Sequence, residues 1–338
     1  MMKTRDTALL CLSVAAVGLL GCGATQPDSV TVYVSEDRVF SEPILKDFEK
    51  ETGIRIKAVY DTEESKSTGV MNRLLAEKAN PQADVYWANE PVRADVLREQ
   101  SISARFVPEA AKDIPEAFKD SQGFWTGFSA RARLFVVNKK AKYRPTGVSS
   151  YGDPSARGRG VIANPLFGTT TAQMAALFSL WGDDRGNQFL ASLKANHVKL
   201  STGNGESANL VASGEFEFAL VDSDDAVAGV RQGKPFEIVY PDQAEGEPGL
   251  LLIPNAVALI RGGPNPASGR KLIEYLLSKE TERKLALADC AQIPLHPGVA
   301  PPAGLKPIAQ LKTMKVNYAE LGVKLQAIQP VLKEWVGY

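Results

Sequence analysis

The stretch FEFALVDSDDA, residues 216–226, runs from a short apolar strand directly into three carboxylates. Glutamate and phenylalanine alternate over residues 215–218, which is the period of a strand with one wet face, and residues 219–221 continue as a buried run. In open α/β sheets, ligands bind just beyond the carboxyl ends of the strands. The candidate ligand residues at this strand end are Asp222, Ser223, Asp224 and Asp225.

The same residues allow a plainer interpretation. Aspartate is a favoured N-cap, so Asp224 or Asp225 would only cap the helix expected over residues 226–232, and the other polar side chains would lie in solvent. This stretch alone leaves both interpretations open.

Three earlier strands end in a similar way. Strand patterns at residues 30–34, 54–60 and 83–88 alternate with helical patterns at 43–53, opened by a proline, and 68–78. Strands alternating with helices form a parallel sheet whose strand ends share one edge, so the chain is predicted to be an α/β protein. The polar residues expected at that edge are Ser35, Glu36, Asp37, Asp61, Thr62, Glu63, Asn89 and Glu90.

The middle of the chain repeats this scheme and adds an anion site. Arg131 and Arg133 precede the strand 134–138, and the strand 161–163 precedes a long apolar helix through residue 181. The start of a helix attracts anions through its free backbone N–H groups, and either arginine would be near enough to assist. A threonine at this position would equally serve as the N-cap. The threonines that open the helix are Thr169, Thr170 and Thr171.

The chain begins with an export segment. A basic start and an apolar run at residues 8–20, too short to span a bilayer as a stable helix, predict a signal peptide over residues 1–21. The run ends in LLGC, which resembles the lipobox of bacterial lipoproteins and implies cleavage before Cys22 and lipid transfer to its sulfur. Residues 22–28 would then form a lipidated tether. The alternative is an ordinary cleaved signal with an incidental cysteine.

Composition limits the remaining function classes. The 39 basic and 39 acidic side chains balance, so the chain carries no footprint of nucleic-acid binding. Cys290 would be the only thiol left after export, and with only His197 and His296 as bases it is expected to be a buried structural thiol. No serine-nucleophile motif, zinc signature or phosphate-binding glycine loop is present, so we expect no enzyme. A carboxylate-based hydrolase and a structural surface lipoprotein remain as rival classes.

An ordered set of short motifs resembles a known family. These motifs are VYVS at 32–35, FEKETGI at 48–54, ADVYWANE at 83–90, GFSARAR at 127–133, ASGE at 212–215 and VNYA at 316–319. Together they are similar to the ferric iron type of periplasmic solute-binding proteins that feed ABC importers, over nearly the whole mature chain. The resemblance implies a two-lobed (type 2) fold with mixed sheets, helices on both faces and a ligand cleft between the lobes. The expected division is residues 29–126 and 254–300 for lobe 1, and residues 127–253 and 301–338 for lobe 2.

The resemblance also implies a metal site. The family's iron site commonly uses a ligand after the first strand, a glutamate after the third and a pair of tyrosines in the second lobe. This chain keeps the glutamate but has an acidic run in place of the tyrosines, and carboxylates suit ferric iron, calcium, magnesium or manganese. The expected metal ligands are Glu36, Glu90, Asp222 and Asp225.

Two ligand classes follow from the same residues. The first is ferric iron or another hard metal ion with a companion anion, carried as the transported solute and not as a cofactor. The second is a phosphorylated organic solute, such as a sugar phosphate or an aminophosphonate, with its phosphate at the threonine helix start and Arg131. The expected partners are an ABC permease with its ATPase, and the membrane through the lipid anchor. The expected state is a monomer in the bacterial cell envelope, periplasmic or on the outer face of the cytoplasmic membrane.

Overall fold

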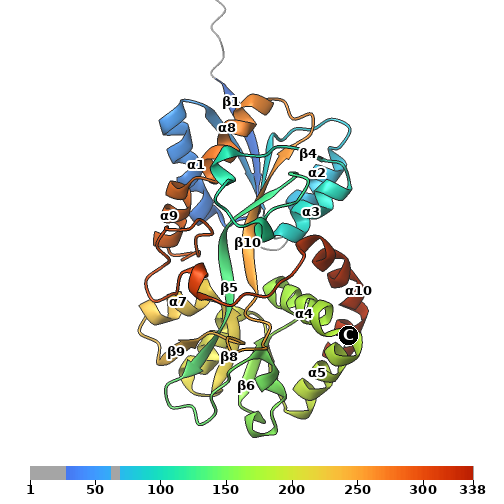
Figure 1. Cartoon of the computed structure of the whole chain (residues 1–338), viewed down its shortest axis with the longest axis vertical. Helices are drawn as coiled ribbons and strands as arrows, with labels where there is room; N and C mark the ends of the chain where they lie inside the picture. Colours follow the sequence, from blue (N-terminus) through green and yellow to red (C-terminus); the bar gives the residue numbers. More distant parts are fainter. Residues whose placement is uncertain (1–27, 62–68, 338) are drawn as a thin grey trace, which may run out of the picture.

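Two crossing strands organise the molecule, which a computed structural model describes over residues 28–61 and 69–337. They are β5 (Thr126–Asn138) and β10 (Leu252–Ile260), and a lobe is built on each end of this antiparallel pair (Figure 1). The expected signal segment, Cys22, Thr62 and Glu63 lie outside the described residues. Within the described ranges, no helix combines the length and the apolar character needed to cross a membrane.

The first lobe contains a mixed sheet of order β2-β1-β3-β10-β5, with β4 beside β10. Strands β1 to β3 are parallel because a helix connects each to the next, whereas β10 returns antiparallel to β3. Gly53 caps the end of helix α1, and its φ of 71° is the left-handed conformation that glycine adopts without strain. The elements are β1 (Ser29–Val34), α1 (Arg38–Thr52), β2 (Arg55–Tyr60), α2 (Gly69–Ala76), β3 (Val85–Ala88), α3 (Pro91–Glu99), β4 (Ser103–Ala104), α8 (Pro266–Leu276) and α9 (Lys279–Leu287).

The second lobe continues the same sheet in the order β5-β8-β6-β7, with β9 also beside β5. The change of partner occurs between neighbouring residues: Ala132 pairs with Leu252 of β10, and Arg133 pairs with Asp222 of β8. The elements are β6 (Gly160–Ala163), α4 (Gly168–Trp181), α5 (Asp183–Ala195), β7 (Lys199–Ser201), α6 (Asn204–Ser213), β8 (Phe218–Asp222), α7 (Ser223–Arg231) and β9 (Phe236–Val239).

The last helix, α10 (Tyr318–Val336), packs against α3 of the first lobe and α4 of the second (Figure 1). Tyr318 at its start donates a hydrogen bond of 2.8 Å to the Leu252 carbonyl, and Trp335 near its end donates one of 2.6 Å to the Leu190 carbonyl. Short 3₁₀ turns complete the chain: η1 (Glu109–Ala111), η2 (Glu116–Phe118), η3 (Val148–Gly152), η4 (Pro154–Ala156) and η5 (Ile308–Gln310).

Several element starts differ from the sequence predictions. Helix α1 begins at Arg38, so Pro43 lies inside the helix and does not open it. The φ that the proline ring fixes is compatible with a helix, although the residue removes one backbone donor. Strand β8 begins at Phe218, so the alternation over residues 215–217 precedes the strand. Helix α7 begins at Ser223, which places both following aspartates in its first turn instead of at its cap.

The crossing strands are irregular at one level. Their register shifts between Pro254 and Asn255, and Ser129 on the opposite strand has a φ of 43°. A bulge of this kind leaves backbone groups outside the regular ladder, which other partners must satisfy.

Candidate functional site

An acidic cluster lies where β8 meets α7. Asp222, Asp224 and Asp225 each offer a carboxylate oxygen within 4.8 Å of the others. Ser223 between them accepts a 3.0 Å hydrogen bond from the Ala132 backbone N–H, which fixes the start of α7 to crossing strand β5. Burial raises the pKa of Asp224 to about 6 and that of Asp225 to about 7, and the neighbouring carboxylates add to both shifts. A bound cation would relieve this unfavourable concentration of negative charge.

Asp222 differs from the other two aspartates because the protein already supplies its partners. Arg133, fully buried and directly opposite on β5, donates from Nη1 to Asp222 Oδ1 at 2.8 Å. The other carboxylate oxygen accepts from Thr169 Oγ1 at 2.7 Å and from Asn204 Nδ2 at 3.1 Å. Asp222 therefore ties β5, α4 and α6 together as a buried ion pair.

The threonines at the start of α4 also face this pair. Arg133 donates to Thr169 Oγ1 at 3.1 Å and to Thr170 Oγ1 at 3.3 Å, so both hydroxyls have partners within the protein. Thr171 Oγ1 is buried and lacks a hydrogen-bond partner in the described part of the chain. The N-cap position is Phe167, which has no side-chain acceptor, and not a threonine. The backbone N–H groups of this helix start thus lie beside the acidic cluster without a side-chain cap.

Arg131 connects the two lobes. From β5 it donates a hydrogen bond through Nη2 to the carbonyl of Asn89, just beyond the end of β3. Burial lowers the pKa of the Arg131 guanidinium, but surrounding carboxylates outweigh burial and raise it, so the side chain remains charged. These carboxylates come from both lobes: Asp222, Glu36, Asp224 and Asp37.

The remaining first-lobe candidates divide into two groups. Glu36 is buried, accepts a 3.1 Å hydrogen bond from Gln292 Nε2 and lies near Arg131. Ser35 Oγ instead donates to Asp61 Oδ2 at 2.8 Å and contacts the Tyr86 hydroxyl at 3.1 Å.

Glu90 is held at the start of α3. Its carboxylate accepts from the backbone N–H groups of Val92 at 2.8 Å and Arg93 at 3.1 Å, and it pairs with the Arg93 side chain at 2.8 Å. The structure therefore brings Glu36, Asn89 and Arg131 together with the aspartates, and directs the Glu90 carboxylate toward its own helix.

Three residues of this arrangement were absent from the predicted site. Arg133 was expected only to assist in binding an anion, and Asn204 was not among the expected site residues. Asn204 in fact opens α6 directly after β7, so the strand-end rule could have found it. Gln292 follows no strand and carries no sequence signal.

The expected buried thiol is confirmed. Cys290 is 3% exposed and donates to the Leu285 carbonyl at 3.4 Å. Burial, together with the Glu36 carboxylate, raises its pKa to about 12, which keeps it a thiol. His296 is not its base, since the imidazole is buried against Glu282, with 2.9 Å between Nδ1 and Oε2.

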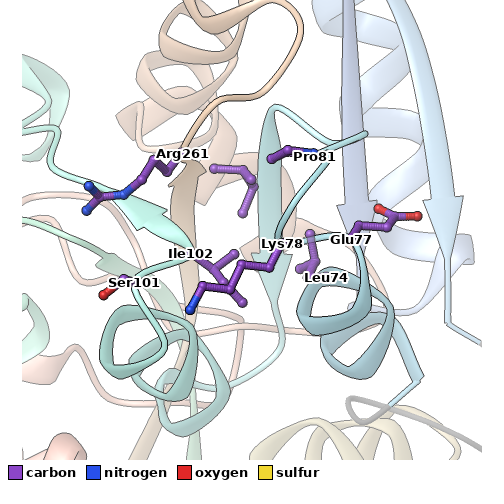
Figure 2. A pocket seen from close by; sticks show the side chains of 8 residues that line it. Leu74, Glu77, Lys78, Pro81, Ser101, Ile102 and Arg261 are labelled. Atoms are coloured by element: carbon purple, nitrogen blue, oxygen red, sulfur yellow. The ribbon is translucent and has the colours of Figure 1, made fainter.

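A separate small hollow of about 140 Å³ lies in the first lobe, between α2, the residues before β4 and the end of β10 (Figure 2). Its charged lining consists of Glu77, Lys78 and Arg261, none of which was expected in the ligand site. Tyr33 and Arg73 already bind the Glu77 carboxylate, so this hollow offers no acidic group free for a cation.

Comparison with known proteins identifies relatives along most of the chain. The family model for bacterial extracellular solute-binding proteins matches residues 44–314. A Salmonella paratyphi A periplasmic protein named for 2-aminoethylphosphonate binding is 27% identical over 288 residues, which cover 83% of this chain and 82% of that protein. The major ferric iron-binding protein of Neisseria meningitidis serogroup A is 25% identical over 309 residues, covering 88% and 90%.

Solved structures confirm the predicted two-lobed fold. Iron-bound HitA from Pseudomonas aeruginosa superposes with a TM-score of 0.78 at 24% identity, covering 92% of this chain and all of that one. AfuA from Actinobacillus pleuropneumoniae, solved with fructose-6-phosphate, gives a TM-score of 0.74 at 20% identity, covering 92% and 98%. At these identities the similarity establishes the fold, and the ligand has to be inferred from the residues of the site.

Proposed function

The chain belongs to the family of bacterial extracellular solute-binding proteins, and we propose that it captures ferric iron, or another hard metal ion, with a companion anion for an ABC importer. The observation that carries this proposal is the cluster of Asp222, Asp224 and Asp225, whose carboxylate oxygens lie within 4.8 Å of one another. Asp222 is held by Arg133, so Asp224 and Asp225 are the principal proposed ligands. Burial and the neighbouring carboxylates raise the pKa values of Asp224 and Asp225, so a cation bound at the cluster would compete with protons and offset the repulsion between the carboxylates.

The charges near the cluster favour a cation. Arg133 is committed to Asp222, which leaves Arg131 to face Asp224 and the first-lobe carboxylate of Glu36. Carboxylate oxygens are hard donors, and they suit a hard, highly charged ion. One relative named for ferric iron binding and another named for iron uptake support the same choice.

The start of α4 supplies a place for the companion anion. Thr169 joins this helix start to Asp222, so an anion held by the backbone N–H groups there would lie next to a metal held by the aspartates. Arg131 adds a fixed positive charge on the same side of the sheet.

An aminophosphonate is the second candidate ligand, because it carries both charges that this site complements. Its ammonium group would take the metal's place among the aspartates, and its phosphonate would take the anion's place at α4. The relative named for 2-aminoethylphosphonate binding favours this alternative. In either case the ligand is bound and released unchanged, without turnover.

A ligand panel distinguishes the candidates. The exported protein would be stripped with a chelator and titrated with ferric citrate, manganese, calcium and 2-aminoethylphosphonate, using calorimetry and native mass spectrometry. We expect one ferric ion per chain and a marked rise in melting temperature. If only the aminophosphonate saturates the protein, the ligand is the organic solute and not a metal ion. If neither binds, both assignments are contradicted. Products would be analysed after incubation, because conversion of the ligand would indicate an enzyme.

We also propose that ligand binding closes the lobes, divided as residues 29–126 with 254–300 and residues 127–253 with 301–338. The two crossing strands and the carboxylates contributed by each lobe to the surroundings of Arg131 support this motion. The protein would act as a monomer that delivers its ligand to the permease.

Export and anchoring complete the proposal. Relatives named as periplasmic proteins support an envelope location, and the LLGC motif supports a lipid anchor on Cys22. Cys22→Ser is expected to abolish incorporation of labelled fatty acid and to move the protein from the membrane fraction to the soluble periplasmic fraction. Cys11→Ser, within the apolar run, is the matched control and should leave both unchanged. Membrane retention of the Cys22→Ser protein would show that the cysteine is incidental.

A further inference from the structure

A buried amide links Glu36 to a distant part of the chain. Gln292, 1% exposed and in the segment that follows α9, donates from Nε2 to Glu36 Oε1 at 3.1 Å. The Gln292 side-chain oxygen accepts from Asn255 Nδ2 at 2.8 Å, and Asn255 belongs to crossing strand β10. Neither amide belongs to the predicted site.

The donor and the acceptor of each hydrogen bond between Trp87, Asn255, Gln292 and Glu36 can be assigned. The Trp87 indole can only donate, and its Nε1 lies 3.2 Å from Asn255 Oδ1, so the Asn255 amide group must point the other way. That NH₂ group donates to the Ser129 carbonyl at 2.7 Å and to the Gln292 oxygen. Gln292 consequently has its NH₂ group left for Glu36, whose oxygen must accept.

The chain of bonds begins at the irregular level of the crossing strands. Asn255 is the residue at the register shift of β10, and it satisfies the carbonyl of Ser129, whose φ is 43°. The N–H of Ser129 donates to the buried carboxylate of Glu282 at 2.7 Å. Both backbone groups of Ser129 at the bulge are thus hydrogen-bonded, and the geometry of the bulge fixes the amide that reaches the site.

We infer that Gln292 is a positioning residue, which orients the Glu36 carboxylate toward the ligand and links that orientation to the bulge through Asn255. This inference rests on the proposed function, because it requires that Glu36 face the bound cation. Removing the Gln292 hydrogen bond takes away one restraint that holds the Glu36 carboxylate away from Arg131, whose guanidinium already lies near it. A carboxylate neutralised by Arg131 contributes less to a bound cation.

The test is a double-mutant cycle with Gln292→Met and Glu36→Gln. Each single variant is expected to weaken ferric citrate binding on the order of ten- to hundredfold, the range for loss of a hydrogen bond to a charged group. If Gln292 acts through Glu36, adding Gln292→Met to Glu36→Gln should change affinity little further. Gln243→Met is the matched control. Gln243 Nε2 also donates to two groups, the carbonyls of Pro241 and Lys312, but neither group belongs to the proposed ligand site.

The outcomes separate the two proposals. Failure of the wild-type protein to bind either ferric citrate or 2-aminoethylphosphonate would contradict the proposed function. Unchanged affinity in Glu36→Gln would contradict the positioning role, because Glu36 would then not face the ligand. A loss in Glu36→Gln together with full additivity, or with wild-type binding by Gln292→Met, would contradict the positioning role alone. Urea unfolding of each variant shows whether it is folded. If Gln292→Met does not fold, the conservative variant Gln292→Asn takes its place in the test. Its shorter amide cannot span the distance to Glu36, so the same loss of affinity is expected.

Discussion

Asp222→Ala is expected to destabilise the folded protein by about 3–5 kcal/mol, because it leaves a buried guanidinium without its carboxylate partner. Arg133 is fully buried and pairs with Asp222 directly across β5 and β8, at 2.8 Å. Thr169 and Asn204 lose an acceptor at the same time. Urea unfolding of the ligand-free protein, followed by circular dichroism, measures the change.

Two companion variants identify the cause of this loss. The double variant Arg133→Met, Asp222→Leu removes both charges and should recover much of the stability, since a buried pair is often replaceable by apolar side chains. Glu237→Ala, which breaks the half-exposed pair with Arg144, should change stability little. A small loss in Asp222→Ala, or no recovery in the double variant, would show that Arg133 is not held by charge pairing.

Local patterns predicted the fold well because the elements are short and regular. The strands at residues 30–34 and 161–163 and the helix through residue 181 appear where periodicity placed them, within one or two residues. Helix starts were less predictable, since a proline usually marks the first turn of a helix, whereas Pro43 lies inside α1. Strand β5 was predicted only from residue 134, because its first half pairs with β10, more than a hundred residues later in the chain.

The rule that ligands bind beyond the ends of strands predicted which residues lie in the site, but not what each of them does. That rule brought the aspartates, Glu36 and Asn89 to one region, and the structure gathers them around Arg131. The rule could not assign roles, because the partners of a carboxylate depend on tertiary contacts. Asp222 is satisfied by Arg133 and Glu90 by the start of α3, whereas Asp224 and Asp225 retain raised pKa values.

Replacing both Asp224 and Asp225 with asparagine is expected to abolish ligand binding and yet to stabilise the ligand-free protein at pH 8. Burial raises the pKa of these groups to about 6 and about 7, from an ordinary value of 3.8, so the folded state binds protons more tightly than the unfolded state. Their ionisation therefore destabilises the fold as pH rises from about 4 to above 7. The two asparagines remove this effect, and we expect a gain on the order of 2–4 kcal/mol.

Replacing a ligand carboxylate should weaken ligand binding and stabilise the ligand-free fold, whereas replacing a structural carboxylate should destabilise the fold. The stability gain should shrink as the pH is lowered from 8 toward 4, because the wild-type aspartates then become protonated in the folded state. Wild-type affinity for ferric citrate should fall over the same range, since protons compete with the metal. Asp184→Asn provides the matched control: Asp184 is an exposed aspartate in the first turn of α5, and its replacement should leave binding intact and not stabilise the fold. A double variant that is less stable than wild type at pH 8 would show that Asp224 and Asp225 hold the fold together, as Asp222 does, and would remove them from the ligand site.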